Sequence, residues 1–151
     1  MSSELKARIN DWKQIENKLI KIGAKFLEEK DVVDTYFSQP EGKVLKLTDS
    51  NDGCTLIELH AKDGKFELAK QEKVQPNKKT ELAKQFGIKC ELKKKIRFFS
   101  FESMKISINL IEDVGDFLIV ESENPKKEFF TEKLGIKSPE WITVSFDKLK
   151  N

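Results

Sequence analysis

The chain contains few residues of the kinds that form disulfide bridges or soft metal sites. Its 151 residues include one histidine and two cysteines, Cys54 and Cys90. The two thiols lack the close spacing of a metal-binding motif, so we expect them to be free and buried, as is usual in a reducing compartment. Neither a cysteine metal site nor a disulfide framework is therefore expected.

Long apolar runs are also absent. No segment of the sequence approaches the roughly 20 apolar residues that a membrane-spanning helix needs. Residues 1–3, Met-Ser-Ser, lead directly into a predicted strand rather than into the apolar region of a signal peptide. We therefore expect a soluble, cytoplasmic protein with no membrane partner.

Neither sign of charge dominates. The chain has 28 Lys and Arg against 26 Asp and Glu, and the resulting net charge of +2 is too weak to indicate a nucleic-acid partner. One basic run, Lys93-Lys94-Lys95 followed by Phe98 and Phe99, keeps RNA binding as a weaker alternative, although such a run is usually a solvated strand end. The length and the apolar content of 38% fit one core, and we expect a single domain over residues 1–151.

Short segments with alternating polar and apolar residues recur along the chain. In residues 4–9, Glu-Leu-Lys-Ala-Arg-Ile, one face is charged and the other is apolar, which is typical of a half-buried strand. The polar positions of the later segments also carry long charged side chains. We therefore expect one antiparallel sheet with a charge-lined second face. The predicted strands are 4–9, 30–37, 44–48, 54–60, 65–74, 91–101, 104–111 and 117–123.

Helix signals separate groups of these strands. The spacing of apolar residues, with caps before them and glycines after them, predicts helices over 12–22, around 82–86 and over 125–134. Ser138-Pro139 predicts a last helical segment that runs to Leu149. The stretches 4–60 and 65–123 share a coarse order of elements, which suggests two related half-sheets.

Basic residues that converge on one face of a curled sheet would need an anion. Two cations about 6 Å apart repel each other by roughly 3 kcal/mol at an effective dielectric constant of about 20. A polyphosphate offers several negative charges to several strands at once. The alternative is a polar face that simply lies in water, where mixed charge is normal. The basic residues concerned are Lys6, Arg8, Lys46, Lys65, Lys95 and Arg97.

An ordered set of short motifs resembles one superfamily. The motifs are Glu4-x-Lys6-x-Arg8, Asp34-Thr35-Tyr36-Phe37, Lys95-x-Arg97, Gly115-x-Phe117 with Glu121, and Ser145-Phe146. In this order, and over almost the whole chain, they are similar to the CYTH superfamily, which includes class IV adenylyl cyclases, thiamine triphosphatases and inorganic triphosphatases. The resemblance implies an α+β fold, in which an antiparallel, eight-stranded, barrel-like tunnel of two related halves has helices packed outside. It also implies that the tunnel binds a triphosphate.

The resemblance assigns phosphate binding to the six basic residues given above. Lys46 and Lys65 stand where members of the superfamily usually have arginine, so the charge is kept but the bidentate fork is lost. Thr48 replaces a further arginine. His60 stands near a usual lysine, although a lone histidine is more often a surface or core residue.

The resemblance also implies a divalent metal, Mg²⁺ or Mn²⁺, held by carboxylates. Several of the expected carboxylates are missing, because Ser2 and Asn109 stand at two of these positions and Ile119 and Ala69 at two more. Such a metal can be bound by one or two carboxylates together with the phosphates of the substrate. The remaining candidate ligands are Glu4, Glu67 and Glu121.

These residues leave two main functions open. With a metal, the protein would be a phosphohydrolase or an adenylyl cyclase-like enzyme that acts on a nucleoside triphosphate, thiamine triphosphate or inorganic tripolyphosphate. Without a metal, it would be a non-catalytic module that binds nucleotide or polyphosphate. Metal-dependent release of phosphate or pyrophosphate would separate the two.

Overall fold

Eight antiparallel strands form a closed ring in the computed structural model, which describes residues 2–150. The sheet order is β5-β4-β3-β2-β6-β7-β8-β1, and β1 also pairs with β5 at Ser3↔Glu67 and Glu4↔Phe66, so the sheet closes on itself. The expected α+β fold with an eight-stranded antiparallel barrel is confirmed. The strands are β1 (Ser3–Ile9), β2 (Lys25–Phe37), β3 (Lys43–Ser50), β4 (Gly53–Lys62), β5 (Lys65–Val74), β6 (Ile88–Phe101), β7 (Met104–Ile111) and β8 (Gly115–Ser122).

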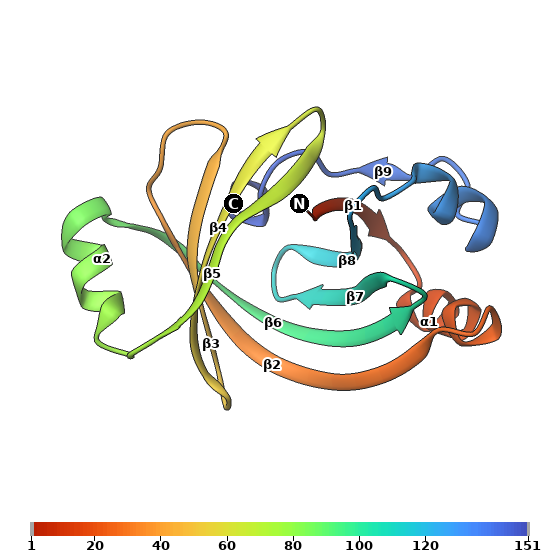
Figure 1. The fold of residues 1–151 in the computed structure, drawn as a ribbon, viewed down its shortest axis with the longest axis horizontal. Coiled ribbons are helices and arrows are strands. Elements are labelled where there is room, and N and C mark those ends of the chain that lie inside the picture. Colours follow the sequence, from red (N-terminus) through yellow and green to blue (C-terminus); the bar gives the residue numbers. More distant parts are fainter. Residues whose placement is uncertain (1, 151) are drawn as a thin grey trace.

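The two longest strands, β2 and β6, join the two halves of the ring. They pair from Lys25↔Ser100 to Phe37↔Ile88 and together form the long curved floor seen in Figure 1. The strands β2 to β5 follow one another on one side of this pair, and β6 to β8 with β1 complete the other side. Because side chains alternate along each strand, one set points into the ring and the other points outward.

The helices lie outside the ring (Figure 1). Helix α1 (Trp12–Lys21) is capped by Asp11, whose carboxylate accepts a hydrogen bond from the backbone N–H of Gln14. Its buried residue Leu19 joins an apolar cluster against the outer faces of β1, β7 and β8, together with Phe130 of the short π-helix η1 (Phe129–Lys133). Helix α2 (Lys78–Phe86) ends at Gly87, as predicted. No helix of residues 2–150 is long and apolar enough to cross a membrane.

The C-terminal segment differs from the predicted helix over 139–149. It forms a two-residue strand, β9 (Glu140–Trp141), and a 3-10 helix, η2 (Phe146–Leu149). The backbone of β9 pairs with the edge of β1, and the indole ring of Trp141 packs against Phe130 with ring centroids 4.8 Å apart. These tertiary contacts outweigh the local helical spacing. The helix predicted over 125–134 forms as a helical run over 127–133, of which Phe129–Lys133 is the π-helix η1.

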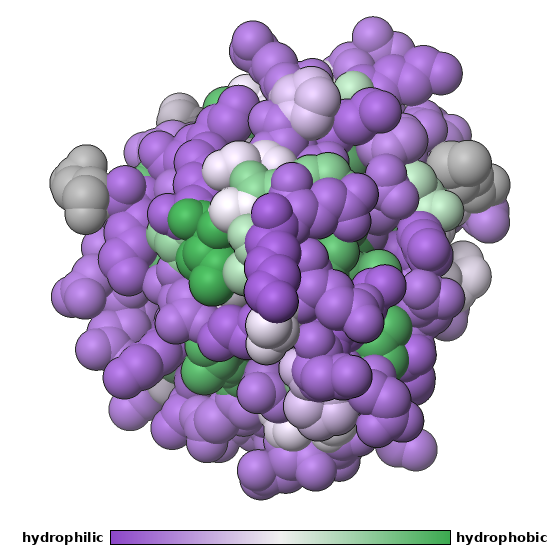
Figure 2. Space-filling model, turned by 90° about the vertical axis from the view of Figure 1, so that its left-hand side faces the viewer, coloured by the Kyte–Doolittle hydropathy of each residue, from purple (hydrophilic) through white to green (hydrophobic). Residues whose placement is uncertain are grey.

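A second apolar cluster fills one end of the barrel. It includes Phe66, Phe117 and Phe146, which come from β5, β8 and η2. The outer surface is mainly polar, and Figure 2 shows mostly hydrophilic side chains with separate apolar patches. Both cysteines are free, with Cys54 buried and Cys90 half-buried.

Candidate anion-binding cavity

A cavity of about 340 Å³ lies inside the ring. All eight strands contribute residues to its wall, and Phe146 of η2 lies at one end. Its volume is at the low end of the roughly 300–1,000 Å³ that is usual for small-molecule sites. The charged residues of the wall gather at two levels, one at the end with Phe146 and the other at the opposite end.

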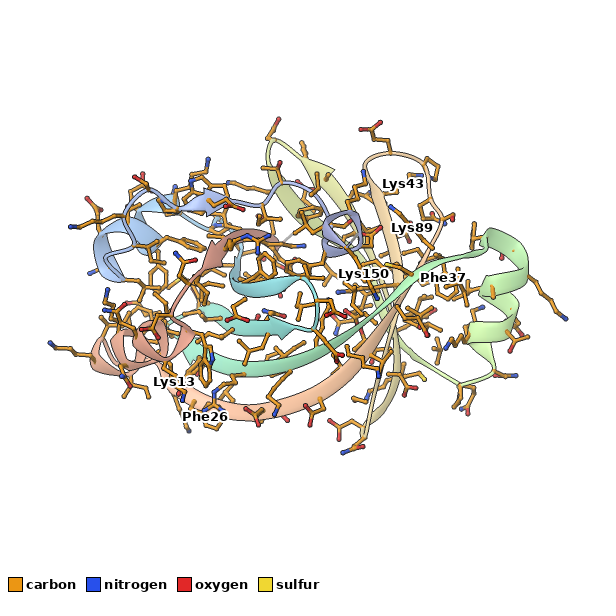
Figure 3. The ribbon with its side chains drawn as sticks, turned by 180° about the vertical axis from the view of Figure 1, so that it is seen from behind. Lys13, Phe26, Phe37, Lys43, Lys89 and Lys150 are labelled. Carbon is orange, nitrogen blue, oxygen red and sulfur yellow. The ribbon has the colours of Figure 1, made fainter. Side chains whose placement is uncertain are left out.

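Phe146 closes its end of the cavity. Its ring packs against Phe117 with the ring centroids 4.7 Å apart. The segment that carries it is tied to β6 by an ion pair of 2.7 Å between Lys89 and Asp147, and by a hydrogen bond from Lys150 to the backbone of β6. Figure 3 shows Lys89 and Lys150 at this end, far from Lys13 and Phe26 beside α1. We call it the closed end.

Lysines surround one buried aspartate at the closed end. Asp34 accepts hydrogen bonds from Lys46 Nζ at 3.2 Å and from the Thr48 hydroxyl at 2.6 Å, and it forms an ion pair of 2.5 Å with Lys94. The side chains of Asp34 and Lys94 are almost fully buried. Lys94 also donates a hydrogen bond to the hydroxyl of Tyr36.

Lys6 supplies a third cation to this group. Its ammonium lies 4.1 Å from the ring centroid of Phe66 and 4.2 Å from that of Phe146, on the aromatic faces that attract cations. It has no ion-pair partner among residues 2–150. Lys6, Lys46 and Lys94, which we call the lysine cluster, therefore have Asp34 as a directly paired carboxylate through Lys46 and Lys94, while the charges of Glu4 and Asp147 act on Lys6 without a direct ion pair.

Burial controls the protonation of the lysine cluster. It lowers the pKa of Lys6 to about 8 and that of Lys94 to about 7. Burial also acts to lower the pKa of Lys46, but the carboxylates of Asp34 and Glu4 together outweigh it and raise that pKa. Burial would raise the pKa of Asp34, yet the two lysines paired with it hold that pKa below its usual range. An anion placed among these lysines would favour their charged forms.

The opposite end of the cavity is bordered by exposed charged side chains, and we call it the mouth. Lys30 forms an ion pair of 2.7 Å with Asp52, and Lys73 donates a hydrogen bond of 3.2 Å to the backbone oxygen of Asp52. Lys105 and Glu121 also line this end. Both signs are present, and the directly bonded partners reduce the positive charge of the mouth.

Lys6 and Lys46 are the two predicted phosphate-binding residues that the structure brings together. Arg8 lies on the same face of β1 as Lys6 but beyond the cavity wall. Its guanidinium packs over Phe117, 4.8 Å from the ring centroid, and forms an ion pair of 2.9 Å with Glu140. The rest of the predicted set lies on the outside of the barrel.

Our assignment of the faces of β6 is wrong. Lys94, Ile96 and Phe98 line the cavity, so the alternate residues Lys95 and Arg97 point outward. Lys95 is exposed beside an open hollow on the outer surface. Arg97 forms ion pairs of 2.6 Å with Glu16 of α1 and Glu29 of β2, and these carboxylates satisfy its charge outside the ring.

The expected inward direction of Lys65 and Glu67 is also wrong, because Leu68 pairs with the cavity-lining Leu59 and its neighbour Glu67 therefore faces outward. Along the β4–β5 pair, Leu59 pairs with Leu68 and Glu58 with Lys70, so Ala69 is an extra residue on β5. An extra residue exchanges the two faces of a strand. Phe66 and Leu68 face the interior before the bulge, and Gln71 and Lys73 after it. Lys65 and Glu67 therefore lie on the outer face.

Two of the three predicted metal ligands remain together. Glu4 and Glu121 are cross-strand partners on β1 and β8, and both line the cavity near the mouth. Ser2 donates a hydrogen bond of 3.0 Å to Glu121. Within residues 2–150 there is no group of three or more His, Cys, Asp or Glu side chains that could hold a metal ion. Two carboxylates plus phosphate oxygens fit Mg²⁺ or Mn²⁺, which keep several waters.

The structure also places the residues that stand where the superfamily usually has a carboxylate, an arginine or a lysine. Asn109 and Ile119 line the cavity, as does Thr48, which bonds to Asp34. His60 does not line it, and its ring nitrogen lies 3.4 Å from Glu58.

Sequence reasoning missed the inward position of Lys94 and the role of Asp34. Lys94 belongs to the basic run 93–95, and because it is buried, this run is not a continuous surface patch. The available signal was the regular alternation of β6, which groups Lys94 with Ile96 and Phe98 on one face.

Comparisons with solved structures find the same architecture over the whole chain. The PH1012 protein of Pyrococcus horikoshii is 25% identical, with a TM-score of 0.87 and coverage of 100% of both chains. A candidate adenylate cyclase of Vibrio parahaemolyticus is 14% identical, with a TM-score of 0.76, over 98% of this chain and 96% of that one. The fold is that of the CYTH superfamily.

A plant structure extends the CYTH comparison. HpAC1 from Hippeastrum, a candidate adenylyl cyclase described as having a dominant triphosphatase activity, is 15% identical with a TM-score of 0.68. The match covers 100% of this chain and 97% of that one. Neither protein-family models nor curated proteins give a match. These likenesses to CYTH structures concern the fold, and the function has to be argued from the cavity.

Proposed function

We propose that the cavity binds a small triphosphate, with its phosphate chain in contact with the lysine cluster. The observation that carries this proposal is the convergence of three lysines at the closed end, where Asp34 pairs directly with Lys46 and Lys94 and the buried Lys6 has no direct ion-pair partner among residues 2–150. Buried unpaired cations are costly, and an anion that forms charge-assisted hydrogen bonds with them offsets this cost.

The candidate ligands are a nucleoside triphosphate, thiamine triphosphate and inorganic tripolyphosphate. All of them present phosphate oxygens that can accept hydrogen bonds from lysine ammonium groups. Among residues 2–150 no arginine lines the cavity. Recognition by lysine alone would therefore rest on point charges rather than on the planar, bidentate grip of arginine. We therefore expect the site to distinguish only moderately between phosphate ligands of different shape.

A second candidate is metal-dependent turnover of the same ligand, as a phosphohydrolase or an adenylyl cyclase-like enzyme. The observation that favours it is the pair Glu4 and Glu121 beside the cavity. The Glu4 carboxylate has no direct hydrogen-bond or ion-pair partner in the described range 2–150, and its charge acts on Lys6 and Lys46. A bound Mg²⁺ or Mn²⁺ would neutralise phosphate charge. The lysine cluster would hold and orient the phosphate chain.

Isothermal titration with ATP and with tripolyphosphate, each with and without Mg²⁺ or Mn²⁺, tests both candidates. The same samples are assayed for phosphate, pyrophosphate and cyclic AMP. Binding without product supports the binding module, and binding with metal-dependent product supports the enzyme. Absence of binding by either anion under all conditions would overturn the proposal.

A further inference from the structure

Four aliphatic side chains surround the middle of the cavity, next to the lysine cluster. We call Val32, Ile57, Ile96 and Ile119 the apolar belt; they come from β2, β4, β6 and β8 and all line the cavity. On β2, Val32 lies between Lys30 of the mouth and Asp34 of the closed end, on the same face. The belt therefore lies between the two charged levels.

Each lysine of the cluster has a member of the belt as its neighbour on the next strand. Val32 is the cross-strand partner of Lys94. Ile57 is the partner of Lys46, and Ile119 is the partner of Lys6. On the way to the mouth, a phosphate held by the lysine cluster would thus first meet aliphatic carbon, and the next cation, Lys30, is the cross-strand partner of Ile96 and is paired with Asp52.

The polar groups at the level of the belt are neutral, and two of them already donate hydrogen bonds within the protein. The Thr48 hydroxyl is already donated to Asp34, and the Asn109 amide donates to the hydroxyl of Ser107. Further phosphates at this level would exchange their water for neutral donors, such as the amide of Gln71, which bind phosphate less strongly than the lysine ammonium groups do. An apolar carbon group at the same level would instead gain from burial.

From this arrangement we infer that the preferred ligand is an ester of phosphate or diphosphate with an apolar alcohol, bound with its phosphate end first. The lysine cluster holds the phosphate end, and the apolar belt covers the carbon part. This inference rests on the proposed function, because it uses the same cations as the anion site. It keeps the anion site of the proposed function but changes the preferred ligand from a triphosphate to an amphiphilic organic phosphate with a shorter phosphate chain. The cavity volume of about 340 Å³ suits a short carbon chain.

The test is isothermal titration, without metal, of inorganic pyrophosphate and of the methyl, butyl and hexyl diphosphates, with tripolyphosphate as the reference anion. Burial of each methylene is expected to tighten binding roughly three- to fourfold, so hexyl diphosphate should bind at least about tenfold more tightly than butyl diphosphate. Ile96→Thr, which keeps the branched β-carbon but replaces an ethyl group by a hydroxyl, should reduce the gain in affinity for each added methylene, as measured relative to the affinity of the same variant for pyrophosphate. Ile88→Ala, at an exposed position of the same strand, is the matched control.

The outcomes separate the inference from the proposed function. If pyrophosphate or tripolyphosphate binds but longer alkyl chains bring no gain, the inference is overturned and the anion site stands. If none of the five compounds binds, both are overturned. A gain with chain length that Ile88→Ala abolishes and Ile96→Thr leaves intact would also overturn the placement of the carbon part in the apolar belt.

Discussion

Lys6 has the environment that most directly favours binding of an anion. Its ammonium is buried between the aromatic rings of Phe66 and Phe146 and has no ion-pair partner in the described part of the chain. Lys94, in contrast, is paired with Asp34. A bound anion would therefore give Lys6 its first ion-pair partner, whereas Lys94 already has one. This difference leads to predictions for single residues.

Lys6→Met should weaken binding of tripolyphosphate. A hydrogen bond to a charged group contributes about 1.5–3 kcal/mol, which corresponds to roughly a 10- to 150-fold loss of affinity. Because methionine fills a similar volume and removes a buried cation, the melting temperature should stay the same or rise. Titration calorimetry and thermal unfolding check the two effects. An unchanged dissociation constant would contradict the role of Lys6.

Binding should also take up protons near pH 8. Burial lowers the pKa of Lys6 to about 8 and that of Lys94 to about 7, so both are partly neutral there. A bound polyphosphate raises these pKa values, and affinity should therefore fall between about pH 7 and pH 9. Titrations in two buffers of different ionisation enthalpy measure the uptake. The Lys6→Met variant should take up fewer protons than the wild-type protein when it binds the polyphosphate. Equal proton uptake by the two proteins would contradict the assignment of part of this uptake to Lys6.

The lowered pKa values also set the sign of their effect on stability. Both lysines have a folded-state pKa below the ordinary value of 10.5. The unfolded chain therefore binds more protons over the window from about pH 7 to pH 10.5, and the contribution of these two groups to stability rises with pH across it. Thermal unfolding of the ligand-free protein at several pH values would show this contribution as a flatter profile in Lys6→Met.

Glu121→Gln should reduce the effect of the metal on binding without weakening metal-free binding of the anion. Glu121 faces Glu4 across β1 and β8, and loss of one carboxylate from a two-carboxylate site should remove most of the effect of Mg²⁺ on binding. Binding of tripolyphosphate in the presence of a chelator should be unchanged or slightly tighter, because a negative charge is removed. Glu123→Gln, two residues further along the chain, is the comparison. A metal effect of equal size in Glu121→Gln and wild type would exclude this residue as a ligand.

At the scale of elements, the short C-terminal helix η2 determines the shape of the site. Phe146 closes the cavity and is 2% exposed. Phe146→Ala should lower the free energy of unfolding by about 3–5 kcal/mol, because it leaves a cavity in the core. Val144→Ala, in the same segment but 37% exposed, should change it by less than about 1 kcal/mol. Urea unfolding measures both values, and a similar loss in the two variants would contradict the account of the closed end.

The positions of the strands could be predicted well from the sequence. Which face of each strand points into the barrel was harder to predict. Alternation on β1 placed Lys6 correctly, since the apolar side of that strand packs against α1 and η1. On β6 alternation groups Lys94 with Ile96 and Phe98, but because both faces carry charge it does not show which face lies inside. On β5 the bulge at Ala69 exchanges the inward and outward faces of the strand, and no local sequence motif indicates this bulge. The C-terminal segment was mispredicted because its structure depends on pairing with β1.

At the scale of the whole molecule, the ring brings strands from both halves of the chain to one cavity. The lysine cluster takes Lys6 from β1, Lys46 from β3 and Lys94 from β6, residues that are far apart in the sequence. Closure of the sheet through β1 and β5 is therefore what creates the concentrated positive charge. The CYTH fold supplies this geometry, and the side chains that line it decide what is bound.

The most direct test of the account compares two neighbouring lysines on opposite faces of β6. Tripolyphosphate is titrated into the wild-type protein, Lys94→Met and Lys95→Met, and thermal unfolding shows that each variant is folded. We predict at least about a tenfold loss of affinity for Lys94→Met, which loses a charged hydrogen-bond donor inside the cavity, and no more than a twofold change for Lys95→Met outside it. A loss confined to Lys95→Met, or the same affinity in all three proteins, would contradict the claim that the cavity is the anion site.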